Sequence, residues 1–256
     1  MPLDTSTYSL AGLRTDGRRW NELRRIHGQI STQAAADGSS YFEMGQTKII
    51  CTVHGPSEGR RTGGGGGRDQ SNSARIDTEI SIAGFSGVDR KRRNRNDKRV
   101  QEMCHTVSSA FSSTLFTHLY PHSSISITLH VLSQDGSLLA ACLNAATLAL
   151  VDAGVPMSDY VAACTTGSTG SYASNDEEAD PLLDLNGVEE QELPFMTIGA
   201  SGGEDRVNVL IMETKVQMVR LEAMISVGFD GCRQIRGILD EIVRAHGKKV
   251  LEARVN

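Results

Sequence analysis

The chain has 256 residues, of which 22% are charged and 39% hydrophobic, and its formal net charge is −5. This composition is typical of a globular protein that is long enough to bury a sizeable core. The negative charge excludes a protein that coats nucleic acid over its whole surface, so any contact with RNA or DNA must come from a local basic patch.

Membrane insertion, secretion and metal binding are not expected from the sequence. It contains no run of about 18 apolar residues, and its first residues lack the charged and apolar blocks of a secretory signal. The five cysteines are scattered singly, which indicates reduced thiols in an intracellular protein. His118 and His122 are separated by Pro121, which disfavours a shared helical face for a metal. We expect neither a metal nor a cofactor.

The first third of the chain predicts strands around a glycine-rich loop. Residues 39–54 read as two strands broken at Gly45, and the second ends at the Gly55-Pro56 turn signal. Residues 57–74 contain five consecutive glycines. Such a segment has too little apolar surface to offset its ordering entropy, so it predicts a mobile loop. Residues 75–85 alternate between apolar and polar side chains and predict a half-buried strand.

A basic segment, residues 89–99, leads into a predicted amphipathic helix near residues 98–119. Seven of its eleven residues are Lys or Arg. The segment has two interpretations: a solvated loop or nuclear-import signal, or a contact with a phosphate backbone. Lys98 and Arg99 lie where the helix begins, so an anion there would meet the helix amides and a guanidinium together.

The centre of the chain predicts a strand followed by a buried helix. Residues 123–132 alternate in polarity, and the helix after Ser137 is apolar nearly all round. Between them lies the turn Asp135-Gly136-Ser137. Small residues with free amides at a helix start favour an anion site, although helix capping by Asp or Ser is the simpler interpretation.

The last third predicts three strands and a long helix. The strands fall at residues 161–166, 195–199 and 207–212, and a second polar loop, predicted to be mobile, covers residues 168–180. The helix runs near residues 217–246, where two glycines favour an interruption. The whole chain, residues 1–256, is therefore predicted to form a single α+β domain with mixed sheets packed against helices.

An acidic segment, residues 180–194, contains Asp184, Glu189 and Glu190. Carboxylates near a phosphate site could act as a general acid or hold a metal. From the residues alone, an acidic surface loop is the favoured interpretation.

Four segments together resemble the RNase PH family of phosphorolytic 3′-exoribonucleases, and within it the eukaryotic exosome branch. They are GLRTDGRRWNELRR (12–25), ADGSSYFEMGQTKIICTVHGP (36–56), VLSQDGSLLAACLNAATLALVDAGVPM (131–157) and PLLDLNGVEE (181–190). Arg14, with the Asp-Gly-Arg triplet that follows, is in step with the family's opening signature. The resemblance implies an RNase PH-like domain of the ribosomal protein S5 domain 2-like fold.

The resemblance also implies that the catalytic site is degenerate. Active members hold phosphate through a Thr-Arg pair in the central turn, where this chain has Leu138 and Leu139. Arg99 matches a second arginine for phosphate and the RNA backbone. Asp184 matches the first of two catalytic aspartates, and Glu190 stands in place of the second, the proton donor. The expected protein binds phosphate weakly and is not an active enzyme.

What the resemblance implies is a core subunit of the RNA exosome, active in RNA degradation and in RNA processing, including that of rRNA. Related subunits form a six-membered ring under RNA-binding cap subunits, and single-stranded RNA passes through the channel to a separate hydrolytic 3′–5′ exoribonuclease. The implied locations are the nucleus, the nucleolus and the cytoplasm. The RNA-contacting residues are expected to be Lys98, Arg99 and Arg95, with Arg60, Arg61 and Arg68 at the pore entrance.

Two alternatives remain open from the sequence. In the first, the chain is an active phosphate-dependent exoribonuclease that releases nucleoside diphosphates, with phosphate held by an arginine of a neighbouring subunit. In the second, it is an α+β protein outside this family whose basic segment is only a localisation signal.

Overall fold

The structure is a computed structural model that describes residues 13–58, 73–87, 90, 97–169, 180–201 and 206–255. The predicted RNA contacts Arg60, Arg61, Arg68 and Arg95 lie outside the described residues, as do most of the two loops predicted at 57–74 and 168–180. At the edges of these loops regular structure extends further than predicted, because the flanking strands reach Glu58 and Ser168.

Five strands form the first sheet. The alternating apolar residues predicted to face inward, Ile125, Ile127, Leu129 and Val131, are all fully buried. Neighbouring strands are antiparallel except for the last pair, which is parallel. In sheet order the strands are β1 (Ile26–Ile30), β2 (Gly38–Met44), β3 (Thr47–Glu58), β5 (Ser123–Ser133) and β4 (Arg75–Ile82). The strand predicted to stop at Gly55-Pro56 therefore continues to Glu58, past an irregularity in its pairing with β5.

A second, antiparallel sheet is built from the last third of the chain. In sheet order its strands are β7 (Pro181–Leu183), β6 (Val161–Ser168), β8 (Phe195–Ser201) and β9 (Arg206–Met212). The three longer strands confirm the prediction, whereas β7 was not foreseen.

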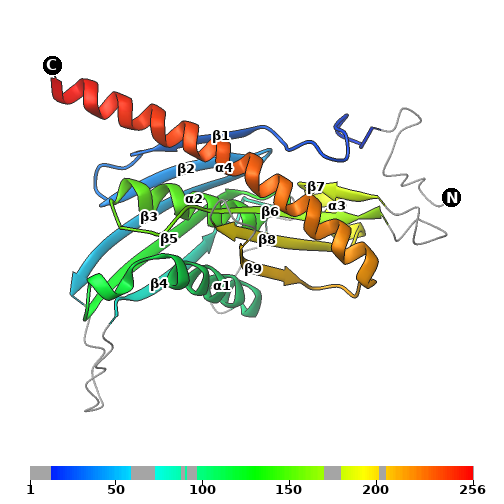
Figure 1. Cartoon of the computed structure of the whole chain (residues 1–256), viewed down its shortest axis with the longest axis horizontal. Coiled ribbons are helices and arrows are strands. Elements are labelled where there is room, and N and C mark those ends of the chain that lie inside the picture. Colours follow the sequence, from blue (N-terminus) through cyan, green and yellow to red (C-terminus); the bar gives the residue numbers. More distant parts are fainter. Residues whose placement is uncertain are drawn as a thin grey trace, which may run out of the picture.

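The helix α2 (Leu138–Asp152) lies between the two sheets and packs against both (Figure 1). Every residue from Leu138 to Leu150 is buried, as its apolar composition predicts. The side-chain amide of Asn144 donates to the Ala163 carbonyl of β6 and accepts the Ala163 backbone amide, both at 2.9 Å. The central helix therefore joins the two sheets through one core.

The helix α1 (Lys98–Thr114) covers β4 with the predicted apolar stripe, of which Val100, Val107 and Phe111 are buried. It is shorter than predicted, because Leu115 is extended and a separate 3-10 turn, Thr117–Leu119, follows. A short helix not foreseen from the sequence, α3 (Gly187–Glu192), holds the acidic segment.

The final helix, α4 (Met218–Val255), is uninterrupted, so the predicted break at its glycines is wrong. The two glycines serve close packing instead. A Cβ at Gly228 would lie 2.4 Å from Ile198 Cδ1, and one at Gly231 would lie 2.5 Å from Leu183 Cδ1. Figure 1 shows α4 crossing the second sheet, with its C-terminal end extending past the strands. Among the described helices, none has the length and apolarity needed to cross a membrane.

Candidate functional site

The turn between β5 and α2 has an uncommon backbone conformation. Gly136 and Ser137 both have positive φ, 73° and 53°. Thr47 of β3 stabilises the turn, because its hydroxyl accepts the Asp135 amide at 3.0 Å and donates to the Gly136 carbonyl at 2.7 Å. A Cβ at Gly136 would lie 2.6 Å from the Asn186 backbone. The turn is therefore packed directly against the start of α3.

The capping interpretation of this turn is wrong. Ser137 is the N-cap residue of α2, but its side chain makes no capping bond. Its hydroxyl instead lies 3.0 Å from Asp184 Oδ1 and 3.1 Å from the Leu185 carbonyl, to which it donates. Asp135 accepts the Gly187 amide of α3 at 3.1 Å. Both side chains connect the turn to the acidic segment instead of closing the helix.

Four of the predicted site residues line one pocket: Arg99, Leu138, Leu139 and Glu190. Leu138 and Leu139 begin α2 and are only 8% and 9% exposed, so they fill space at the inner side of the pocket. The remaining lining comes from α1, the β5–α2 turn, β8, β9 and the residue after β9: Glu102, Met103, Thr106, Gln134, Phe195, Thr197, Ile211 and Glu213.

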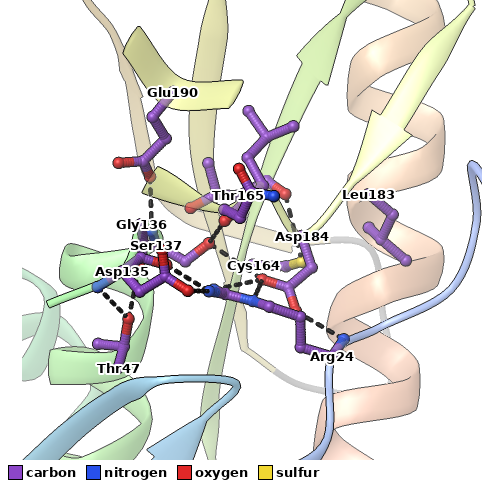
Figure 2. A network of polar contacts seen from close by, with 12 residues as sticks. Arg24, Thr47, Asp135, Gly136, Ser137, Cys164, Thr165, Leu183, Asp184 and Glu190 are labelled. Atoms are coloured by element: carbon purple, nitrogen blue, oxygen red, sulfur yellow. Dashed lines mark hydrogen bonds and ion pairs between the residues drawn. The ribbon is translucent and has the colours of Figure 1, made fainter. Parts of the chain in front are cut away.

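Glu190 places a carboxylate on the N-terminal end of α2. Its Oε1 accepts the Ser137 amide at 2.5 Å (Figure 2). Burial raises the pKa of Glu190 above its ordinary value, against the opposing effects of the Ser137 amide and of the positive charges of Arg24 and Arg99. A backbone donor that could hold a ligand anion is therefore bonded to an anion of the chain itself.

Asp184 is completely buried and does not line the pocket. Arg24 binds its Oδ1 through Nε at 3.1 Å and Nη2 at 2.8 Å, and binds its Oδ2 through the backbone amide at 2.8 Å (Figure 2). With the Ser137 hydroxyl, the carboxylate has four donors. Burial alone would lower the pKa of the Arg24 guanidinium, but the Asp184 carboxylate raises it above its ordinary value. This pairing offsets the high cost of burying either charge alone.

A second arginine, Arg14, ties the N-terminal segment to the same region and is 2% exposed. Its guanidinium forms a two-point ion pair with Glu189 and donates to the carbonyls of Leu183 at 2.5 Å and Asp184 at 3.0 Å. Glu189 also closes a capping box with Asn186 at the start of α3. The interpretation of residues 180–194 as an acidic surface loop is thus wrong for Asp184 and Glu189, which are buried and paired.

The sequence interpretation singled out Arg14 only through the family resemblance and missed Arg24. A signal was present, because buried carboxylates require compensating cations and the segment 14–25 is rich in arginine. What the sequence does not contain is which arginine meets which carboxylate, since the partners lie 160 or more residues apart.

Lys98 and Arg99 are exposed at the start of α1. The Asp97 side chain caps this helix by accepting the Arg99 amide at 3.4 Å. The predicted combination of helix amides and guanidinium is therefore wrong in part, because an internal carboxylate already occupies an amide. The Arg99 side chain is 59% exposed, and its Nη2 lies 3.9 Å from Glu213 Oε1. It remains accessible at the mouth of the pocket.

Among the residues that the structure describes, no group of three or more His, Cys, Asp or Glu could hold a metal ion. The histidines predicted not to share a helical face are separate here too, with His118 in the 3-10 turn and His122 beyond it with φ of 62°.

Residues 22–156 match the model of the 3′ exoribonuclease family, domain 1 (RNase PH). The chain is 37% identical to the exosome complex component ski6 of Schizosaccharomyces pombe, covering 95% of this chain and 96% of that protein. It is 38% identical to the exosome complex component SKI6 of Saccharomyces cerevisiae, covering 94% of each. The crystal structure of Rrp46 from rice (Oryza sativa) superposes with a TM-score of 0.74 at 25% identity, covering 90% of this chain and 100% of that one.

These similarities extend over both sheets and the central helix, and they confirm the resemblance and the fold inferred from the four sequence segments. The chain belongs to the 3′ exoribonuclease, or RNase PH, family.

Proposed function

We propose that this protein is a core subunit of an RNA exosome that builds the ring and guides single-stranded RNA through it without catalysing phosphorolysis. Near full-length similarity to two proteins named as exosome complex components supports the assembly. Its partners are then the other RNase PH-like subunits, the cap subunits, RNA and an associated hydrolytic exoribonuclease.

The pocket composition carries the proposal that phosphorolysis is lost. Phosphorolysis needs a phosphate dianion held in line with the scissile bond. In the part of the lining that the structure describes, the apolar Leu138 and Leu139 and three carboxylates stand against one guanidinium, that of Arg99. A leucine in place of a phosphate-binding arginine removes a charge-assisted contact worth about 1.5–3 kcal/mol. The carboxylates repel the dianion in addition.

Two further contacts support the same proposal. Glu190 accepts the Ser137 amide, which is then not free to bind phosphate oxygen. Asp184 is committed to Arg24 and Ser137 in the protein interior, so its role is to stabilise the turn and not to transfer a proton in the pocket. Replacing one leucine of the pocket by the family's phosphate-binding residue would therefore leave the contacts of Glu190 and Asp184 unchanged.

Phosphate-dependent release of nucleoside diphosphates tests this proposal directly. The assembled ring without any hydrolytic partner is incubated with single-stranded RNA at increasing phosphate, and the diphosphates are quantified. We expect no release above that of a phosphate-free control. Phosphate-dependent release that is lost when Leu139 is replaced by the bulkier Phe would establish the active alternative, with phosphate held by a neighbouring subunit.

Guidance of RNA is assigned to the exposed cations at the start of α1. A few cations along a confined path are enough to bind a phosphate backbone, even in a chain with a net charge of −5. Lys98 and Arg99 are accessible beside the pocket. Arg95, Arg60, Arg61 and Arg68 remain predicted contacts outside the described residues.

The charge reversal Lys98→Glu with Arg99→Glu tests this assignment in the assembled complex. We expect weaker RNA binding and a salt dependence whose slope falls by about 1.4, since each lost contact to single-stranded RNA removes about 0.7. Lys248→Glu with Lys249→Glu, both exposed near the end of α4, is the matched control because it changes the net charge by the same amount. If the charge-reversed and control complexes bind RNA with equal affinity and equal salt dependence, Lys98 and Arg99 do not contact the RNA.

We also propose that the protein acts in the nucleus, the nucleolus and the cytoplasm, in line with a role in RNA processing and degradation. A fluorescent fusion expressed at its natural level tests this. Exclusion from the nucleus would contradict it and would also argue against an import role for the basic segment 89–99.

A further inference from the structure

The pocket that has lost its phosphate ligands has a distinct chemical character of its own. Its buried lining is apolar, with Leu138 and Leu139 at the start of α2. Its exposed lining is acidic, because Glu102 is exposed and the side chain of Glu213 is 56% exposed. An apolar interior beneath an acidic mouth is a poor site for an anion, but it suits a group that has both an apolar part and a positive charge.

The charges of the pocket favour a cation. Among the lining residues that the structure describes, Glu102, Glu190 and Glu213 carry negative charge and Arg99 carries positive charge, which gives a formal net charge of −2 when all four are ionised. Arg99 offsets this only in part, since its guanidinium is 3.9 Å from Glu213 in an exposed pair. The burial that raises the pKa of Glu190 is a cost that a bound cation would relieve.

The apolar lining favours an organic cation over a metal ion. A hard metal ion such as Mg²⁺ or Ca²⁺ takes oxygen ligands, so it gains nothing from the side chains of Met103, Leu138, Leu139, Phe195 and Ile211. An RNA phosphate that entered the pocket would meet the carboxylates of Glu102 and Glu213, so the backbone proposed to contact Lys98 and Arg99 stays outside it. A lysine or arginine side chain fits both parts, because it buries a methylene stem along apolar surface while its charged head stays among carboxylates and water.

We infer that this pocket receives a long basic side chain, lysine or arginine, presented by a partner protein. The inference rests on the proposed loss of phosphate binding, since one pocket serves both. A surface that positioned phosphate in active relatives would in this chain serve as a docking point for protein.

A side-chain analogue tests the inference on the full chain. The methyl groups of Leu138 and Leu139 are labelled, and their NMR signals are followed during titration with n-butylammonium, n-butylguanidinium and the isosteric neutral 1-butanol. We expect saturable shifts with at least one of the two cations and binding of 1-butanol that is at least about tenfold weaker. Glu102→Gln with Glu213→Gln is expected to weaken cation binding by about three- to tenfold. Glu241→Gln, exposed on α4 and outside the pocket lining, serves as the control.

The outcomes separate this inference from the proposed function. Equal shifts with 1-butanol and the cations, or no saturation with either cation, would overturn the inference while leaving the loss of phosphorolysis in place. Inorganic phosphate that saturates the shifts at a lower concentration than either cation, at constant ionic strength, would overturn both. An unchanged cation affinity in the double variant would also overturn it, because the carboxylates would then have no part in binding.

Discussion

Replacing Asp184 by asparagine tests whether this family aspartate is structural in this chain. The substitution keeps the size of the side chain and removes its charge, leaving the Arg24 guanidinium, whose side chain is 6% exposed, without the partner that lies 2.8 Å away. Breaking a buried ion pair from one side costs about 3–5 kcal/mol. For a chain of this length, that corresponds to a fall in Tm of about 6–20 °C.

Chemical and thermal unfolding of the full chain measure the effect. Asp230→Asn is the matched control, because Asp230 forms an exposed pair with Arg233 and its side chain is 66% exposed; its cost should stay below about 1 kcal/mol. The double variant Arg24→Met with Asp184→Asn should be less destabilised than the sum of its single variants. Equal and small effects of Asp184→Asn and Asp230→Asn would refute the structural role of the buried pair.

Three further predictions concern the pocket and the last helix. Leu139→Arg should tighten phosphate binding about ten- to hundredfold in calorimetry, as one charge-assisted contact returns; unchanged affinity in a folded variant would contradict the account of the pocket. Gly228→Ala should destabilise the chain by about 1–3 kcal/mol because its Cβ meets Ile198, whereas Gly237→Ala, with open space around it, should be neutral or stabilising in the same denaturant series. Because burial raises the pKa of Glu190 above 4.5, the folded wild type binds the proton more tightly than the unfolded chain. Its free energy of unfolding relative to Glu190→Gln should therefore fall as pH rises from about 4 to 7, and a difference that does not change with pH would contradict this.

Much of the fold was predictable because the spacing of apolar residues along the sequence indicates which residues are buried. The alternation at residues 123–132 matches β5, in which buried and less buried residues alternate, and the apolar run after Ser137 matches α2, which is buried on all sides from Leu138 to Leu150. Short elements were missed for the same reason. Strand β7 has only three residues and α3 only six, which is too few for a period to stand out.

Which residues form the candidate site was easier to predict than the contacts that these residues make. Family resemblance singled out Leu138, Leu139, Arg99 and Glu190, which the structure brings to one pocket; their functional roles stay predictions. Local sequence could not place Asp184 in the interior, because burial of its charge depends on an arginine 160 residues away. Local sequence also could not predict that α4 continues through Gly228. The close packing of this glycine against Ile198 of β8 overrides its weak helix propensity.

The buried arginine contacts also set an order of events in the synthesis of the protein. Arg14 and Arg24 leave the ribosome 160 to 175 positions ahead of Leu183, Asp184 and Glu189, which hold them in the folded protein. A nascent chain that ends before β7 (Pro181–Leu183) lacks Asp184 and Glu189, and so lacks the carboxylates that neutralise Arg24 and Arg14 in the folded protein. The segment that carries Arg14 and Arg24 therefore completes its ion pairs only after Asp184 and Glu189 have been made, and a product truncated before them lacks both pairs.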